Sequence, residues 1–239
     1  MPELILATFN TQLGLRARIH RFAEYDVAAV CHELDADVLA LQEVWRGPDE
    51  PAVLDRLRSA GYQTDELELS GIRRIEGHKP RATAGRPGTI SIAVASRYPI
   101  VARREIPMGR VWRDPIGPRA ALHVELDVGG SAVDVVVLHT SSRLPYGPVQ
   151  HLRTLRRELP NGSRPAVVAG DCNIWGPVVA RVLPEWSRAA RGKTWPAHAP
   201  HSQIDHILVN RHVTAVESTV IEHHDSDHRP LRATLRFSP

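Results

Sequence analysis

A chain of 239 residues with 42% hydrophobic content can bury one large core, so we expect a single domain over residues 1–239. Two cysteines, Cys31 and Cys172, are too few for a disulfide framework, and no C-x-x-C pair is present to hold zinc. The first thirty residues carry no long apolar run behind a basic start, and no stretch approaches eighteen apolar residues. We therefore expect no membrane span and a cytoplasmic location. The net charge of +3 permits an anionic substrate.

Short apolar strands that end in polar side chains begin the chain. Residues 4–9 predict a strand that delivers Asn10, and residues 37–41 predict a second buried strand that ends in Gln42 and Glu43. Between them, the apolar residues of 22–34 fall at helical spacing and predict an amphipathic helix. Because the same arrangement occurs twice, Asn10 and Glu43 are expected to line one pocket.

A basic segment occupies residues 70–88, after a short helix predicted between Pro51 and Gly61. Its glycines, prolines and scarcity of apolar residues predict a long loop. Two interpretations remain open, a solvated surface loop and a loop that contacts a polyanion. In the second interpretation the substrate contacts would come from Arg73, Arg74, Arg81 and Arg86.

Four predicted strands then follow in quick succession. They cover residues 89–96, 100–106, 120–128 and 132–139. The short connections Tyr98-Pro99 and Gly129-Gly130 predict antiparallel hairpins. Arg119 stands before the third strand and His139 ends the fourth, so polar groups again lie at strand boundaries.

The most informative stretch follows a predicted helix over residues 148–159. Residues 167–169 form a small apolar run that reaches Gly170, and Asp171 and Asn173 come directly after it. Gly170 lets the backbone turn sharply, so both polar side chains can face one cavity. The competing interpretation of Asp-x-Asn after a glycine is a surface turn. Another short helix is expected from about residue 177.

The C-terminal segments supply a carboxylate and an imidazole. Residues 203–209 predict a strand with Asp205 near its start, and residues 226–231 open the last strand with His228. Asp205 would fix the tautomer of His228 and raise its pKa. A metal cluster nearby is an alternative that we disfavour, because tandem histidines are common in polar loops. That cluster would consist of His223, His224 and Asp225.

Six short motifs, in this order, resemble the endonuclease/exonuclease/phosphatase superfamily. They are Thr8-Phe9-Asn10, Leu41-Gln42-Glu43-Val44, Ser96-Arg97-Tyr98-Pro99-Ile100, Gly170-Asp171-Cys172-Asn173, Ile204-Asp205-His206-Ile207 and Ser226-Asp227-His228-Arg229-Pro230. Each is weak alone, but their order across residues 8–230 makes the resemblance specific. It implies a four-layer α/β sandwich, with two mixed, mostly antiparallel sheets face to face, helices outside and the site at one end of the sheets.

The resemblance also implies hydrolysis of a phosphate ester by in-line attack of water, with Mg²⁺ as the cofactor and Mn²⁺ as its substitute. Glu43 would be the main metal ligand, with Asn10 as a second. Asp227 could hold a metal-bound water, and Arg119 could reach a phosphate oxygen.

The catalytic roles implied by the resemblance fall to five residues. Asp171, with Asn173 holding its geometry, would orient and deprotonate the attacking water. His228, paired with Asp205, and His139 would bind the phosphoryl oxygens as they gain charge. The division of labour between Asp171 and His228 as general base stays open.

The substrate is the least determined feature. The basic segment and the positive net charge favour DNA or RNA, so a nuclease is expected. The small charge excess and an aromatic content of only 5% speak against it. The alternative is a phosphatase or phosphodiesterase for a lipid or small-molecule phosphate, and a more distant one is an inactive binding module, disfavoured because no motif residue is missing. No protein partner is implied, and a monomer is expected.

Overall fold

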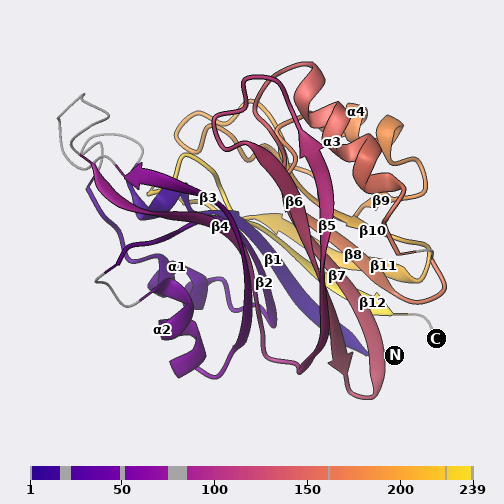
Figure 1. Ribbon diagram of the computed structural model, residues 1–239. Coiled ribbons are helices and arrows are strands. Elements are labelled where there is room, and N and C mark those ends of the chain that lie inside the picture. Colours follow the sequence, from indigo (N-terminus) through magenta and orange to yellow (C-terminus); the bar gives the residue numbers. More distant parts are fainter. Residues whose placement is uncertain are drawn as a thin grey trace.

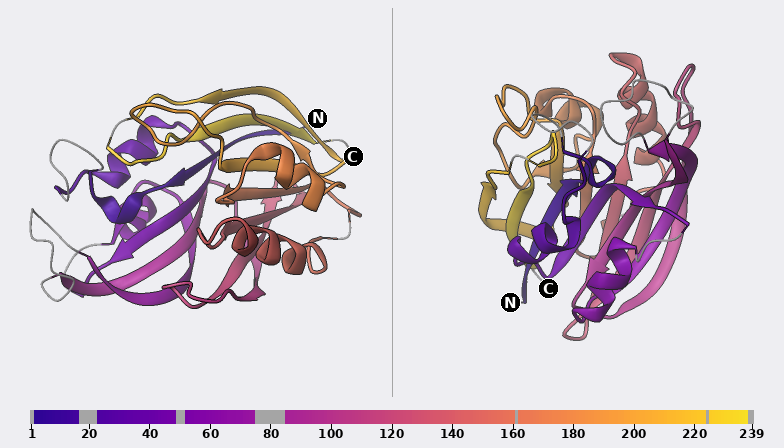
Figure 2. Two further views of the ribbon diagram at one scale, coloured as in Figure 1. Left: turned by 90° about the horizontal axis from the view of Figure 1, so that it is seen from above. Right: turned by 90° about the vertical axis from the view of Figure 1, so that its left-hand side faces the viewer.

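The computed structural model describes residues 2–16, 23–48, 52–74, 85–160, 162–223 and 225–237. It is a four-layer α/β sandwich of two six-stranded mixed sheets, as predicted (Figures 1 and 2). The first sheet has the order β11-β12-β1-β2-β4-β3, and the second has the order β5-β6-β7-β8-β10-β9.

The elements of the first sheet and its covering helices come mainly from the N-terminal half. The strands are β1 (Glu3–Asn10), β2 (Val38–Arg46), β3 (Gln63–Arg74), β4 (Arg86–Ser96), β11 (Val213–Val220) and β12 (Leu231–Phe237). The helical segments are the short 3-10 helix η1 (Gln12–Gly14), α1 (Val27–Glu33) and α2 (Val53–Ser59). The apolar faces of α1 and α2 pack on the outer face of this sheet, where their leucines and valines meet Phe9 and Leu41.

The second sheet comes from the middle of the chain. Its strands are β5 (Ile100–Arg110), β6 (Pro118–Val128), β7 (Ser131–His139), β8 (Ala166–Asp171), β9 (Ser187–Arg188) and β10 (Asp205–Val209). Helices α3 (Tyr146–Arg156) and α4 (Gly176–Val182) cover its outer face. Leu152 and Leu155 of α3 and Val179 of α4 are fully buried there.

The main core lies between the two sheets. Alternate residues of each central strand point into it, such as Leu4 and Leu6 of β1 and Val135 and Val137 of β7. The intervening side chains, such as Val136, pack under the helices instead. Both faces of the central strands are therefore buried, which is why these strands read as continuous apolar runs in the sequence.

Each sheet contains one parallel pair at its centre, and these two pairs position the polar residues. β1 pairs with β2 and β7 with β8 in parallel, while the other strand pairs are antiparallel. Helix α1 connects the first pair and α3 the second. Parallel strands end at the same end of a sheet, so Asn10, the last residue of β1, lies opposite Gln42 of β2, and His139 lies directly opposite Asp171.

One of the two expected hairpins is corrected and the other is confirmed. β4 and β5 do not form a hairpin, because Tyr98-Pro99 carries the chain from one sheet to the other. Tyr98 packs against the core between the sheets, a tertiary contact that a short Pro-containing connection does not reveal. The Gly129-Gly130 hairpin between β6 and β7 is confirmed, with φ of 61° and 85° as a two-residue turn of this kind requires.

The basic segment 70–88 is also not one long loop. Its two ends are paired strand residues, with Arg74 opposite Arg86, and residues 75–84, including Arg81, lie outside the described residues. Gly88 marks a close approach, since an added Cβ would lie 2.6 Å from the indole nitrogen of Trp45. Pairing with β4 therefore overrides the loop-like composition of this segment.

Candidate active site

Glu43 reaches the site from a β-bulge in the first sheet. The register of β2 against β4 shifts between Leu41 and Val44, and Glu43 there has a φ of +52°. A bulge of this kind re-aims a side chain, and a positive φ in a residue with a Cβ persists only where its surroundings hold it. Asn10 provides part of that support, because its Nδ2 donates to Glu43 Oε1 at 3.3 Å.

Asn10 also links the two sheets. Its Nδ2 lies 3.1 Å from Asp171 Oδ2, and its own Oδ1 accepts from the backbone N–H of Gln12 at 3.0 Å. Asn10 is buried, so its amide is held in one orientation by these contacts. The ends of β1 and β8, 161 residues apart in the chain, therefore meet at one point.

Asp171 and His139 end the parallel pair of the second sheet. His139 Nε2 lies 3.6 Å from Asp171 Oδ2 and 3.8 Å from Glu43 Oε1. Asn173 braces this end, since its backbone N–H donates to Asp171 Oδ1 at 2.8 Å and its Nδ2 donates to the Thr140 carbonyl at 3.1 Å. Gly170 is required here, because an added Cβ would lie 2.0 Å from the Leu138 carbonyl oxygen.

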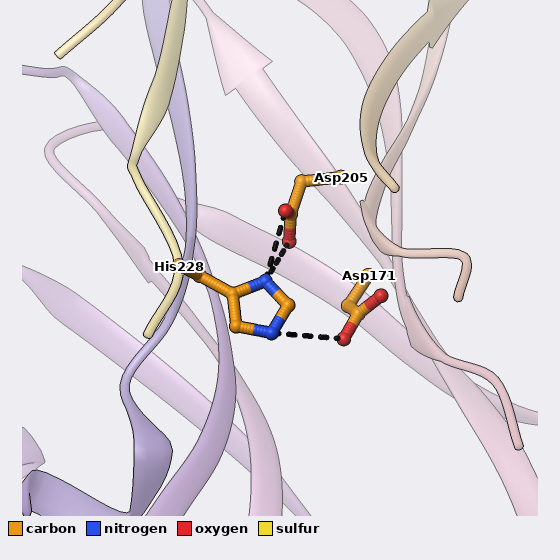
Figure 3. Close-up of side chains that lie close together, drawn as sticks. All are labelled: Asp171, Asp205 and His228. Atoms are coloured by element: carbon orange, nitrogen blue, oxygen red, sulfur yellow. Dashed lines mark hydrogen bonds and ion pairs between the residues drawn. The ribbon is translucent and has the colours of Figure 1, made fainter. Parts of the chain in front are cut away.

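Asp205 and His228 form a buried pair beside Asp171 (Figure 3). His228 Nδ1 lies 2.9 Å from Asp205 Oδ2 and 3.1 Å from Oδ1, and its Nε2 faces Asp171 Oδ2 at 3.8 Å. Asp205 is brought here by β10, where it lies directly opposite Asp171. The imidazole thus bridges two carboxylates with its two nitrogens.

Asp227 lies at the more exposed edge of the cluster. Its Oδ1 is 3.8 Å from His228 Nε2, and its Oδ2 accepts from Trp195 Nε1 at 3.3 Å. Its backbone N–H donates to Gln12 Oε1 at 2.7 Å. Sequence reasoning missed Gln12 and Trp195, and neither stands in a pattern that indicates contact with Asp227.

Arg119 is buried against the backbone of the site. Its Nε and Nη2 donate to the two oxygens of Asp114, both at 3.1 Å, and its Nη1 donates to the His139 carbonyl at 3.3 Å. Asp114 was not identified from the sequence, where an Asp five residues before an Arg carries no specific signal. In these contacts Arg119 fixes the strand end that presents His139.

The arginines of the β3–β4 hairpin make contacts around Glu24 and Trp45. Arg74 is buried, ion-pairs with Glu24, and stacks 3.7 Å from the centre of the Trp45 ring. Arg86 ion-pairs with the same glutamate. Arg73 is exposed, and its Nη1 donates to the Gly85 carbonyl at 2.9 Å.

The electrostatics of the cluster show an excess of negative charge. Burial, and then the neighbouring Asp205, raise the pKa of Asp171 to about 7. Burial and Asp227 raise the pKa of Glu43. Burial opposes protonation of His228, but Asp205 and Asp171 outweigh it and hold the pKa of His228 well above its usual range. Burial, Arg119 and His228 keep the pKa of His139 well below that range, so His139 stays neutral.

A divalent cation fits the Glu43 side of the cluster. Glu43 offers carboxylate oxygens, the ligands that Mg²⁺ and Mn²⁺ prefer, and added positive charge would offset the crowded carboxylates. Asn10 turns its Nδ2 toward Glu43, while its Oδ1 accepts from the Gln12 N–H. One group of possible ligand atoms among the described residues falls within 4.8 Å: Asp171, Asp205 and His228. Since His228 Nδ1 is already hydrogen-bonded to Asp205 and its Nε2 is 3.8 Å from Asp171, we assign these three to an Asp–His–Asp cluster held by hydrogen bonding and charge.

The alternative cluster near the C-terminus has other contacts. The His223 ring packs edge-on against Phe9 with centroids 5.2 Å apart, and Asp225 ion-pairs with Arg16. His224 lies outside the described residues.

Both free cysteines, Cys31 and Cys172, are buried.

A sandwich that gathers carboxylates and imidazoles at one end of both sheets is the architecture of a class of phosphoesterases. The chain belongs to the Endonuclease/Exonuclease/phosphatase family, whose model matches residues 7–228. Members of this family are hydrolases of phosphate esters and generally depend on a divalent metal.

Solved structures share the fold at low sequence identity. One is an endonuclease/exonuclease/phosphatase from Beutenbergia cavernae DSM 12333, with a TM-score of 0.78, 22% identity, and coverage of 100% of this chain and 72% of that one. The mannosyl-6-phosphatase Bt3783 of Bacteroides thetaiotaomicron VPI-5482 has a TM-score of 0.69 at 17% identity, covering 98% of this chain and 100% of that one. A humanized D. rerio TDP2 has a TM-score of 0.69 at 18% identity, covering 98% of this chain and 99% of that one. Among curated proteins, no sequence match to this chain was found.

Proposed function

We propose that this protein is a Mg²⁺-dependent phosphodiesterase that hydrolyses nucleic acid by in-line attack of water. The observation that carries the proposal is the environment of Asp171 Oδ2. Asn10 Nδ2, His139 Nε2 and His228 Nε2 approach this oxygen at 3.1, 3.6 and 3.8 Å. A carboxylate at the centre of such a set can orient a water and accept its proton while the imidazoles face the phosphoryl group.

Asp171 is suited to the role of general base. Its pKa of about 7 lies near the operating pH, where a base is both available and strong enough to take a proton. Asn173 holds Oδ1 through its backbone N–H, and Oδ2, which accepts one hydrogen bond from Asn10, has a further lone pair for the water.

His228 and His139 are suited to bind phosphoryl oxygens. His228 is cationic because of Asp205, and its Nε2 can donate to an oxygen that gains charge in the transition state. His139 stays neutral, and its Nε2 faces the same space as a further donor or acceptor. Arg119 acts through the backbone of His139, and its remaining donor hydrogens make direct phosphate contact a second possible role.

Glu43 would hold the metal, Asn10 would join it through Oδ1 after rotation of its amide, and Asp227 could hold one of the metal's waters. A bound Mg²⁺ supplies positive charge to the phosphoryl oxygens and the leaving group. Mg²⁺ keeps several waters and binds few protein ligands, which agrees with one carboxylate and one amide as the protein's share.

A phosphomonoester is the second candidate substrate. One structurally similar protein is named a mannosyl-6-phosphatase, and the residues of the cluster suit mono- and diesters alike. The basic segment supports a nucleic-acid substrate less than its composition suggested, because Arg74 and Arg86 form ion pairs with Glu24.

The helices in the described part of the chain are all too short or too polar to span a membrane.

A substrate panel tests the proposal. The purified chain and its Asp171→Asn variant would be assayed with and without Mg²⁺ on single- and double-stranded DNA, RNA, sphingomyelin and sugar phosphates. We expect cleavage of a nucleic acid that requires Mg²⁺ and falls by at least about 10²-fold in the variant. Turnover of a sugar phosphate alone would replace the nuclease with the phosphatase, and equal rates in both proteins would refute the role of Asp171.

A further inference from the structure

Three exposed aromatic side chains lie at the active-site end of the second sheet. Trp112 is 69% exposed and Trp175 is 59% exposed, and Tyr146 is also exposed. Trp112 lies in the connection after β5 and Trp175 in the connection after β8. Tyr146 begins α3, directly after the connection that follows β7. β6 is antiparallel to β7 and β7 is parallel to β8, so all three connections leave the sheet at the end that carries His139 and Asp171. This is the upper end of the molecule in Figure 1 and the end that faces the viewer in Figure 2, left.

Arginines lie among these rings. The Arg113 guanidinium stacks 4.1 Å from the centre of the Trp112 ring. Arg143 Nε donates to the Arg113 carbonyl at 2.8 Å, and Tyr146 Oη donates to the Trp112 carbonyl at 3.4 Å. The backbone of Trp112 and Arg113 is therefore held by the next connection, while the Trp112 side chain stays open to solvent.

The same connections are tied to the active site. Asp114, two residues after Trp112, binds Arg119, which in turn donates to the His139 carbonyl. Trp175 stands two residues after Asn173, whose side chain donates to the Thr140 carbonyl. Both exposed indoles thus extend from backbone that also fixes catalytic side chains.

We propose that Trp112, Arg113, Arg143, Tyr146 and Trp175 form an aromatic ledge that binds the unstacked bases of single-stranded nucleic acid next to the scissile phosphate. The proposal rests on the proposed function and gives its substrate class. Aromatic faces stack on bases, and interleaved guanidiniums contact the phosphates between them. A duplex keeps its bases paired inside, so its bases cannot stack on such a ledge.

The low aromatic content of the chain does not count against this ledge. Stacking needs only a few rings at the correct place, and this end of the second sheet presents three of them with two guanidiniums nearby. A lipid surface would bury the same exposed rings together with Leu144, which is exposed beside Arg143. We favour bases because the guanidiniums match a chain of phosphates and the ledge adjoins a phosphoesterase cluster.

Binding is tested separately from cleavage. Affinity for a labelled twelve-nucleotide single strand and for the matched duplex would be measured by fluorescence anisotropy in the Asp171→Asn protein. In that background, Trp112→Ala and Trp175→Ala should each weaken single-strand binding about 10-fold. Trp112→Phe should retain most of the affinity because it keeps a stacking face, and quenching of tryptophan emission should accompany binding.

The matched control is Val101→Ala, which removes another exposed apolar side chain, on β5 one residue from its start. It should leave affinity unchanged, and melting temperatures should show that all the variants fold. Affinity within twofold of the parent in the Trp112→Ala, Trp175→Ala double variant would overturn the ledge, as would equal losses for duplex and single strand. Loss of binding to anionic lipid vesicles with unchanged oligonucleotide affinity would assign the ledge to a membrane instead.

The ledge and the proposed function fail in different ways. If the wild-type chain binds the single strand through the two indoles but cleaves no nucleic acid with Mg²⁺, the nuclease proposal falls and the ledge stands. If the chain cleaves nucleic acid with no contribution from the indoles to binding, the ledge falls and the nuclease proposal stands.

Discussion

The pairing of His228 with Asp205 makes the sharpest prediction about turnover. The two side chains are buried and hydrogen-bonded at 2.9 Å, and His228 Nε2 points to Asp171. Removing one preorganised donor to a developing oxyanion costs about 10²- to 10³-fold in kcat. We therefore expect His228→Ala to lower kcat at least about 10²-fold, with a much smaller change in KM.

Asp205 acts on the reaction mainly through His228, to which it is hydrogen-bonded, and it also contributes to the raised pKa of Asp171. Asp205→Asn keeps the volume and an oxygen that can accept from Nδ1, but it removes the charge that raises the pKa of His228. At neutral pH a smaller fraction of His228 is then cationic, so we expect a loss of about 10-fold in kcat. The double variant should be little less active than His228→Ala alone, because the imidazole through which Asp205 acts is already absent.

The assay is a double-mutant cycle in kcat on the best substrate of the panel, with melting temperatures to confirm folding. His123→Ala is a matched control, because His123 Nε2 makes a similar contact with Asp134 at 2.7 Å on β6, away from the cluster. It should leave kcat unchanged. A double variant about 10³-fold below wild type would mean that the two losses multiply, and the reasoning would be refuted.

Three further predictions concern the metal, the basic hairpin and the pH dependence of stability. Glu43→Gln should lower activity at least about 10²-fold. It should also remove the rise in melting temperature that we expect Mg²⁺ to cause in the wild type, and unchanged activity would exclude Glu43 as a metal ligand. Arg74→Gln should lower the free energy of unfolding by about 1–2 kcal/mol, because the Trp45 ring and the Leu13 carbonyl lose the buried guanidinium that contacts them. The same change at exposed Arg73 should have no such effect, and equal urea midpoints for the two variants would contradict this. Burial lowers the pKa of His206 to about 4, below its ordinary value of about 6.5, so the unfolded chain binds a proton first as the pH falls. The free energy of unfolding should then decrease by up to about 3 kcal/mol between about pH 6.5 and pH 4, and His206→Gln, which can still donate to the Ile174 carbonyl, should flatten this decrease in urea titrations.

Elements buried on both faces were predictable from the sequence. The runs that end at Asn10, His139 and Asp171 are apolar because both faces of their strands are covered, and their polar ends stand out for the same reason. The sheet to which each strand belongs was not predictable, as the wrong hairpin between β4 and β5 shows. That partition depends on contacts between distant parts of the chain, which local patterns do not contain.

The edge strand β11 and the residues that support the site residues from behind were not predictable from the sequence. β11 is exposed along most of its length, so its sequence lacks the apolar alternation of a half-buried strand, and it was not predicted. Asp114 is important only because β6 brings Arg119 and β7 brings His139 to it. Such a residue has no sequence signal of its own, since its partners are defined by strand pairing.

Backbone strain and buried charge coincide at the end of the sheets that carries the cluster. Glu43 and Asn173 both have a positive φ despite their side chains, with φ of +52° and +48°. Burial raises the pKa of Glu43 and Asp171, so the folded state holds carboxylates that would ionise more easily in the unfolded chain. Any cation that binds these carboxylates in the folded state alone stabilises the fold as it activates the site. We therefore expect metal binding and stability to be coupled at this end of the sheets.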